Sequence, residues 1–449
     1  MKTLIQNAKL LLPEGGGFRI SCGDIIINDR LISRILLHDN DRTDIPGNTE
    51  KTDRVIDASG CLVMPGLINA HTHAYMSLFR NYADDLEFFD WLHKVEQVED
   101  LMSEEDCYWT TMLSIAEMIR TGTTCFVDMC LRSSRNGHTS GPQGAVSGAV
   151  NDSGIRAFLS RGLVGDAEDE GSLRRLNEFL ADANLNQDSD RTGFILGPHA
   201  PYSCNQSILK LIRHTGIEEN MMATIHISES LAEVEGMARD HGGITPVRYI
   251  ADSGLFDLPA IAAHLVYATD EDIEILKAHN VSIAINPRSN MKLGNGFAPV
   301  EKFLKSGVNI CLGTDGSGSN NTQNMFQEMN FAGLVYKGSE RKARCVDAAD
   351  VIRFATIGGA RALQMDNRLG VLKENALADI IILDLNVPQF VPQNDLVSAL
   401  VYSANGSEVR TVIVNGLVVM EDRNILTFDE ALVYSRCEEI AERLMKKMN

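Results

Sequence analysis

The chain has 449 residues, of which 44% are hydrophobic and 23% charged, as in an ordinary globular protein, and its length allows roughly two to three domains. Its formal net charge of −20 argues against nucleic acid or an anionic membrane surface as a partner. We find no signal-peptide segment, no run of about 20 apolar residues that could span a membrane and no CxxC pair among the nine cysteines, so we expect a cytoplasmic protein with reduced thiols.

Short strands separated by turn residues are predicted near the N-terminal end, at 3–12, 24–27, 31–37 and 54–57. Strand character returns near the C-terminal end, at 379–383, 409–415 and 417–420. We predict that the strands of the two ends form one small β-sandwich domain, residues 1–58 and 367–425. A final amphipathic helix is predicted at 429–447, within a C-terminal segment of residues 426–449.

Between these ends, apolar strand-like runs alternate with helix-like stretches. The eight runs lie at 61–73, 123–128, 157–161, 193–199, 223–229, 260–264, 281–286 and 308–315. Helix signals separate them: Ser103 begins a capping box, Thr269 opens another helix, and Gly216 and Gly307 are placed to end two more. Near-continuously apolar strands alternating with helices predict a closed parallel (β/α)8 barrel, the TIM-barrel architecture, over residues 59–366.

Polar side chains stand at the C-terminal ends of these strands, where such barrels carry their active sites. They are His71, His73, Asp128, Arg161, His199, His226, Glu229, His264, Asn286 and Asp315. One such residue is more often structural than functional, and a pair such as His71 and His73 also arises by chance. A polar residue at nearly every strand end is much harder to explain in that way.

His71 and His73 share one face of an extended strand because side chains two residues apart point the same way. With His226 and Asp315 they offer three nitrogens and one oxygen, a set that suits zinc or Fe²⁺ and leaves room for water. A bound water with a pKa near 7 supplies hydroxide at neutral pH. Strand four ends at His199 and has no lysine that could bridge two metals, which favours one metal ion.

Glu229 lies three residues beyond His226 and could move a proton between the nucleophilic water and a substrate. The alternative interpretation is a carboxylate at a helix N-terminus, with Glu233 and Glu235 as further solvated examples. The polar, Gly/Ser-rich stretch 132–148 is either a mobile lid or a tolerated insertion, and the sequence leaves both open.

Together, these residues make the chain resemble the amidohydrolase superfamily over essentially its whole length. Within it, the chain resembles the 5-methylthioadenosine/S-adenosylhomocysteine deaminases, although triazine hydrolases and other aromatic-ring deaminases share part of the pattern. The stretches that carry the finer resemblance are 80–86 with Trp91-Leu92, 197–203, 286–293, and 312–316 with 319–321.

The resemblance implies roles for the conserved types of residue at the strand ends. His71, His73, His226 and Asp315 would bind one divalent metal ion, zinc or alternatively Fe²⁺. Glu229 would protonate the ring nitrogen and carry the proton of the water, and His264 would polarise that water together with Asp315. Hydroxide would attack the amine-bearing ring carbon, and ammonia would leave.

For the substrate, the resemblance implies that His199 contacts the purine ring, Trp91 packs on the base or sulfur side, and Arg161 reaches the far end. Glu99 matches the ribose-binding glutamate only if one residue is missing after Trp91. The stretch 317–324 also departs from the usual pattern. A homocysteine tail would be gripped in the 132–148 loop, where Arg132 and Arg135 are candidates.

Methylthioadenosine and S-adenosylhomocysteine therefore both stay open as substrates. So does another aminated or chlorinated ring, such as guanine, a pterin, cytosine or an s-triazine. A non-catalytic scaffold would have lost metal ligands, and none is missing here. We expect a small-molecule substrate and, as is usual for such relatives, a homo-oligomer, either dimer or tetramer.

Overall fold

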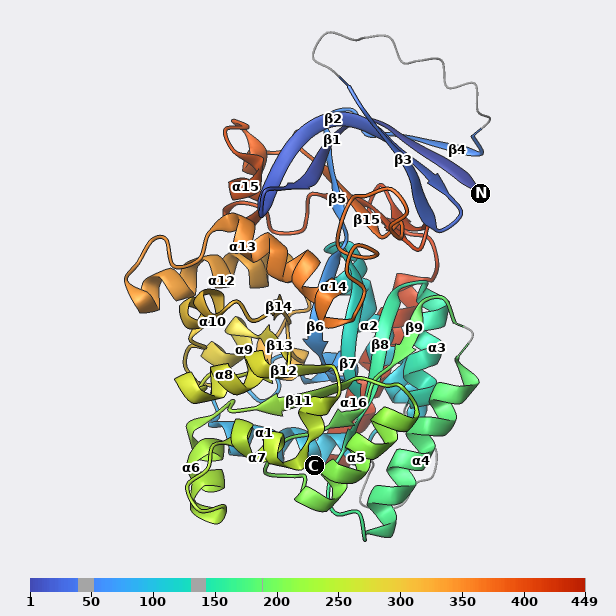
Figure 1. Cartoon of the computed structure of the whole chain (residues 1–449). Coiled ribbons are helices and arrows are strands. Elements are labelled where there is room, and N and C mark those ends of the chain that lie inside the picture. Colours follow the sequence, from blue (N-terminus) through green and yellow to red (C-terminus); the bar gives the residue numbers. More distant parts are fainter. Residues whose placement is uncertain (39–51, 131–142, 188, 449) are drawn as a thin grey trace.

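The computed structural model describes residues 1–38, 52–130, 143–187 and 189–448, which form a mixed α/β protein (Figure 1). Strands from both chain ends pair in one nine-stranded sheet, at the top of Figure 1, in the order β18-β17-β16-β15-β5-β1-β2-β3, with β4 on β1. Their bounds are β1 Lys2–Glu14, β2 Gly17–Asn28, β3 Leu31–Leu37, β4 Arg54–Asp57, β5 Cys61–Pro65, β15 Ile380–Asp384, β16 Val409–Val414, β17 Leu417–Glu421 and β18 Asn424–Ile425. The predicted association of the two chain ends is confirmed.

The apolar run at 61–73 is divided at Gly66, so the prediction of one continuous barrel strand is wrong there. Strand β5 pairs with β15 and β1 in the nine-stranded sheet, whereas β6 pairs with β7. At Gly66 a Cβ would overlap the Thr124 side chain, so the chain passes from one sheet to the other where only a glycine fits. The nine-stranded sheet thus includes β5, which begins after residue 58, the predicted end of the N-terminal segment.

The other strands form two parallel sheets, one of five strands and one of four. Their bounds are β6 Leu67–Thr72, β7 Thr123–Cys130, β8 Arg156–Leu163, β9 Thr192–Phe194, β10 Gly197–Pro198, β11 Ala223–Ile227, β12 Ala260–His264, β13 Ser282–Ile285 and β14 Ile310–Leu312. The two sheets meet at a bridge between Leu196 and Ala223, and on the other side Asp315 N donates to His71 O at 2.9 Å. Every predicted strand region contains a strand, and the fourth is split into β9 and β10.

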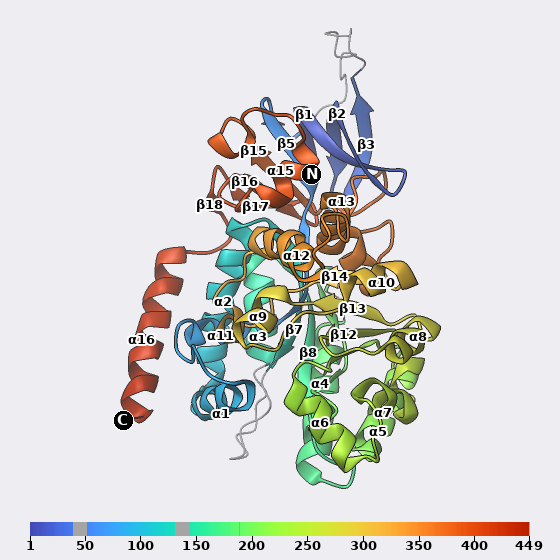
Figure 2. The same ribbon diagram turned by 90° about the vertical axis from the view of Figure 1, so that its left-hand side faces the viewer.

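Helices surround the parallel strands (Figure 1). Their bounds are α1 Phe88–Glu99, α2 Glu104–Arg120, α3 Gln143–Ser153, α4 Glu170–Leu185, α5 Gln206–Glu218, α6 Leu231–Asp240, α7 Pro246–Ser253, α8 Asp270–Ala278, α9 Pro287–Lys292, α10 Val300–Ser306, α11 Ser317–Asn320, α12 Met325–Glu340, α13 Ala348–Arg353, α14 Gly359–Ala362, α15 Leu396–Tyr402 and α16 Glu430–Met448. The final helix, α16, lies beside α2 on the outside of the molecule (Figure 2). In the part of the chain that the structure describes, no helix combines the length and apolarity needed to cross a bilayer.

Local sequence signals predicted several of the helix ends. Capping boxes form at Ser103 and at Thr269, as predicted, and α10 ends at Gly307, which has a φ of +79°. Helix α5 instead continues past Gly216 to Glu218. A Cβ at Gly216 would overlap Leu258, so this glycine permits close packing and does not end the helix.

A buried ion pair joins the nine-stranded sheet to the base of the parallel strands. Arg156 of β8 donates through Nε and Nη2 to the two carboxylate oxygens of Asp379, at 2.9 and 3.0 Å. Asp379 also accepts from the backbone N–H of Asn415, and Arg156 donates to the carbonyl oxygen of Asp190. The carboxylate and the guanidinium are both almost wholly buried, so each depends on the other for its charge partner.

Candidate metal centre and active site

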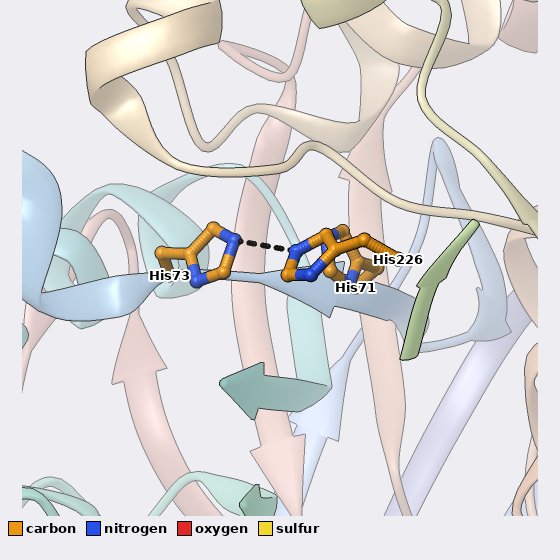
Figure 3. A group of neighbouring side chains, drawn as sticks. All are labelled: His71, His73 and His226. Carbon is orange, nitrogen blue, oxygen red and sulfur yellow. Dashed lines mark hydrogen bonds between the residues drawn. The ribbon is translucent and has the colours of Figure 1, made fainter. Parts of the chain in front are cut away.

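Four side chains that could bind a metal ion converge at the C-terminal ends of the parallel strands. His71 lies in β6, His73 follows it, and His226 lies in β11 (Figure 3). The Nε2 atoms of His73 and His226 are 3.2 Å apart, and Asp315 Oδ1 lies 3.2 Å from His73 Nε2 and 3.5 Å from His71 Nε2. A tetrahedral zinc ion with bonds of about 2.0–2.1 Å separates its ligands by roughly 3.4 Å. The spacing therefore fits one metal ion.

Hydrogen bonds on the far side of two imidazole rings orient them toward this point. His73 Nδ1 donates to Met129 O and His226 Nδ1 donates to His199 O, each at 2.7 Å, because a carbonyl oxygen can only accept. The Nε2 atoms then present lone pairs to the centre, as metal-ligating histidines do. Two such lone pairs 3.2 Å apart repel unless a proton or a cation lies between them. His71 Nε2 is buried and has no hydrogen-bond partner among the described residues, so the donor set fits a divalent cation.

Two buried hydroxyls fix the carboxylate of Asp315. Ser289 and Ser319 both donate to its Oδ2, at 2.6 and 2.7 Å. The other oxygen, Oδ1, is the one that faces His71 and His73. The two serines thus select which oxygen of Asp315 points into the centre.

His264 and Glu229 lie beside the four candidate ligands, where they offer an imidazole and a carboxyl group. His264 Nδ1 is 2.9 Å from Asn290 Oδ1, and its Nε2 is 3.6 Å from Glu229 Oε2. Burial lowers the pKa of His264 to about 4, so the ring is neutral at pH 7. Burial, with the nearby charges of Asp315 and Glu233, raises the pKa of Glu229 well above its ordinary value. A carboxyl group with a raised pKa binds a proton more strongly than an ordinary glutamate, which suits a proton carrier.

A pocket of about 560 Å³, including its open mouth, leads to these residues. Trp91, Glu99 and His199 line it, and Trp91 donates through Nε1 to Gly318 O at 3.1 Å. Glu99 accepts a 2.6 Å hydrogen bond from Tyr75, and burial raises the pKa of Glu99 to about 7. Much of the remaining wall is apolar or aromatic, with Met76, Phe88, Leu92, Met129, Cys130 and Tyr202. Such a wall suits an aromatic ring held between apolar side chains.

Arg161 lies on the opposite face of strand β8 from the residues that line the pocket, and its contact with a substrate stays a prediction. Phe158 packs in the interior of the parallel strands and Gly162 lines the pocket, so the even-numbered positions face inward. The Arg161 guanidinium points outward and pairs with Glu178 of α4, with Nη1 and Oε2 2.7 Å apart. This placement does not bring Arg161 to the pocket.

The predicted loop at 132–148 falls mostly on residues 131–142, which lie outside the described residues, as do Arg132 and Arg135. Residues 143–148 belong to helix α3, so that part of the loop prediction is wrong. The roles assigned to the other site residues stay predictions, although the structure brings them together around one pocket.

Several polar residues that support the centre gave no clear signal in the sequence. Gln323 accepts hydrogen bonds from the hydroxyls of Thr72 and Thr314, both at 2.8 Å, and donates to Asp315 O at 2.9 Å. It ties β6 to the segment after β14, and it lies in the stretch that departs from the family pattern. Glu233, which we expected to be solvated, is only 2% exposed. The only cue to Gln323 in the sequence was that its stretch departs from the family pattern. The only cue to Glu233 was its position near the start of a helix.

Comparisons with known proteins identify the family of the chain. A model of the amidohydrolase family matches residues 62–419. A 5-methylthioadenosine/S-adenosylhomocysteine deaminase of Thermoanaerobacter pseudethanolicus is 44% identical over 400 residues, which cover 88% of this chain and 90% of that protein. A protein of the same name from Desulforamulus reducens is 39% identical over 453 residues and covers 99% of this chain and 100% of its own length. The solved structure of an adenosine deaminase from Xanthomonas campestris with bound zinc covers 99% of this chain and 98% of its own, with a TM-score of 0.90 and 27% identity. The resemblance seen in the sequence is confirmed, and the chain belongs to the amidohydrolase family.

Proposed function

We propose that this protein is a metal-dependent hydrolase of C–N bonds that replaces the ring amino group of an adenosine-type nucleoside by oxygen and releases ammonia. The observation that carries the proposal is the convergence of three imidazole nitrogens and Asp315 Oδ1 at the base of a largely apolar pocket, beside Glu229. The names of the relatives at 39–44% identity support a thioether nucleoside, S-adenosylhomocysteine or 5′-methylthioadenosine, as the substrate.

We assign His71, His73, His226 and Asp315 to one divalent cation, zinc with Fe²⁺ as the alternative. A cation held there would lower the pKa of a water molecule and so supply a nucleophile at neutral pH. The neutral His264 accepts a hydrogen bond from the attacking water through Nε2. Glu229 takes a proton from that water and delivers it to the ring nitrogen next to the amine-bearing carbon. The second proton of the water passes to the amino group, the bond from the ring carbon to that nitrogen breaks, and ammonia leaves while the water oxygen stays on the ring as a carbonyl.

The rest of the substrate contacts the residues of the pocket wall. Trp91 and the aromatic residues near it hold the ring or the sulfur side, and His199 presents its imidazole to the ring edge. Glu99 accepts a hydrogen bond from a ribose hydroxyl in this proposal. The alternative ring, such as guanine, a pterin, cytosine or an s-triazine, would need the same water and proton carrier but no ribose contact.

We also infer that the parallel strands close into an eight-stranded barrel over residues 59–366, and that the nine-stranded sheet folds into a small β-sandwich from residues 1–58 and 367–425. Hydrogen bonds at both junctions of the parallel sheets support closure. Nine free cysteines support a reducing, cytoplasmic environment. A homo-oligomer, dimer or tetramer, is part of the same proposal.

An ammonia-release screen with metal analysis of the same sample tests the function. The panel contains S-adenosylhomocysteine, 5′-methylthioadenosine, adenosine, guanine, cytosine, a pterin and an aminated s-triazine. We expect one metal ion per chain and ammonia from the thioether nucleosides. Ammonia from free bases or triazines alone would transfer the proposal to the alternative ring, and no ammonia from any 6-aminopurine nucleoside would refute it.

A further inference from the structure

Glu233 is a buried carboxylate whose two oxygens bind consecutive backbone amides. It is the third residue of helix α6, after the N-cap Ser230, and it is 2% exposed. Its Oε1 accepts from Ser228 N at 2.9 Å, and its Oε2 accepts from Glu229 N at 2.8 Å. A side chain at this position normally returns to the N-cap amide, here that of Ser230, and this one also reaches two and one residues further back, to the turn that carries Glu229.

The turn held by Glu233 has an uncommon backbone conformation. Ser228 has a φ of +54°, in the left-handed region that non-glycine residues rarely adopt. A left-handed residue lets successive N–H groups point to the same side and form a concavity that binds an anion. Here the group in the concavity is the carboxyl group of Glu233, whose pKa is raised by burial to about 7 and lowered in part by the backbone N–H groups. The strained residue and the carboxylate that binds beside it therefore form one unit.

This unit lies directly behind the proposed proton carrier. The Glu229 side chain extends from the turn, with Oε2 3.6 Å from His264 Nε2 and Oε1 accepting from Asn295 Nδ2 at 3.3 Å. A change of backbone angle at residue 228 or 229 would swing that carboxyl group away from His264. Among the described residues no lysine or arginine forms an ion pair with Glu233, so backbone amides compensate its burial, those of Ser228 and Glu229 together with that of Ser230.

We propose that Glu233 is a positioning residue, which holds the 228–229 turn and thereby sets the distance between the Glu229 carboxyl group and the substrate ring. The inference rests on the proposed function, because Glu229 is its proton carrier. Glu233 itself touches neither the metal ligands nor the pocket that holds the substrate. Its substitution should therefore slow turnover without removing metal or weakening substrate binding.

The test compares Glu233→Gln with Glu235→Gln, a matched change two residues on in the same helix, where the side chain is exposed. Glutamine keeps one acceptor oxygen but turns an N–H group toward the second amide, so one of the two hydrogen bonds is lost. Backbone hydrogen exchange of residues 226–230 is measured in the metal-loaded protein without substrate. We expect at least tenfold faster exchange at Ser228 and Glu229 in Glu233→Gln and no change in Glu235→Gln.

Steady-state ammonia release and metal content are measured on the same samples. In Glu233→Gln we expect kcat to fall at least tenfold, with KM within about threefold of wild type and metal content unchanged. Unchanged exchange, or a loss of kcat matched by an equal loss of metal, would overturn the positioning role. If the glutamine variant does not fold, Glu233→Asp, which keeps the charge but is shorter, must show the same faster exchange, and wild-type exchange there would overturn it too. A wild-type protein that releases no ammonia refutes the function, and the exchange experiment still tests the turn.

Discussion

Removing the hydroxyl group of one serine that donates to the Asp315 carboxylate should weaken metal binding, although every metal ligand stays in place. Ser289 and Ser319 are both fully buried and both donate to Oδ2. We expect Ser289→Ala and Ser319→Ala each to lower zinc affinity, because the carboxylate that keeps a single donor can rotate its Oδ1 away from His71 and His73. The double variant should bind more weakly than either single variant.

The size of the effect follows from the hydrogen bond that is lost. A hydrogen bond to a charged group is worth about 1.5–3 kcal/mol, and each 1.4 kcal/mol is a factor of ten in affinity. The loss therefore corresponds to a roughly 10–100-fold fall in affinity, which is also the usual effect of removing a group that orients a metal ligand. Each alanine leaves a space of only one oxygen atom, so we expect little further loss from packing.

Zinc affinity is measured by titrating the metal-free protein in competition with a chromophoric chelator. Ser317→Ala is the matched control, because Ser317 is equally buried in the same segment but its hydroxyl lies 3.4 Å from Gln323 Nε2 and not on Asp315. We expect this control to stay within about twofold of wild type. Single variants at 289 and 319 that also stay within twofold would refute the role of the hydroxyls.

Three further outcomes test other parts of the molecule. Glu229→Gln should fold and bind metal normally but lose at least roughly 100-fold in kcat, because general acid–base groups contribute about 10²–10⁴-fold; unchanged turnover would remove Glu229 from the mechanism. Burial raises the pKa of Glu99 to about 7, so the ionised acceptor is lost as pH falls below 7 and KM for nucleosides should rise there; Glu99→Gln should lose this pH dependence, and an identical profile would refute the ribose contact. Asp379→Ala strands the buried Arg156 guanidinium and should cost about 3–5 kcal/mol, seen as a lower melting temperature, and an unchanged melting temperature would contradict the role of the pair.

The sequence predicted the strands well because each is a short apolar run between turn residues. It could not predict which sheet a strand joins, because an apolar run has the same composition in either. The run at 61–73 shows this: Cys61–Pro65 and Leu67–Thr72 are equally buried, yet they pair in different sheets. The glycine between them was visible, but the close approach of Thr124 that requires it depends on the tertiary structure.

Side-chain direction explains why the sequence could bring His71 and His73 together but could not show the surroundings of Arg161. His71 and His73 were assigned from the two-residue period of a strand, which also places Phe158 and Gly162 on one face of β8. The same period applied to β8 points Arg161 away from the pocket, toward Glu178. Its predicted role came from its place at a strand end and from the family resemblance, and neither of them shows which way the side chain points.

Supporting residues were harder to predict than ligands, and the backbone at the strand ends explains why they are needed. Ser228, His264 and Asp315 all have positive φ angles, between +54° and +75°, where the chain turns out of a parallel strand. Such conformations are costly for non-glycine residues and persist only where neighbours hold them. Glu233 binds the amides at Ser228, and Gln323 binds the carbonyl of Asp315. Because these supports come from helix α6 and from the segment between α11 and α12, both of which follow the strands, a change at Glu233 or Gln323 can alter the centre without removing any group that touches the metal or the substrate.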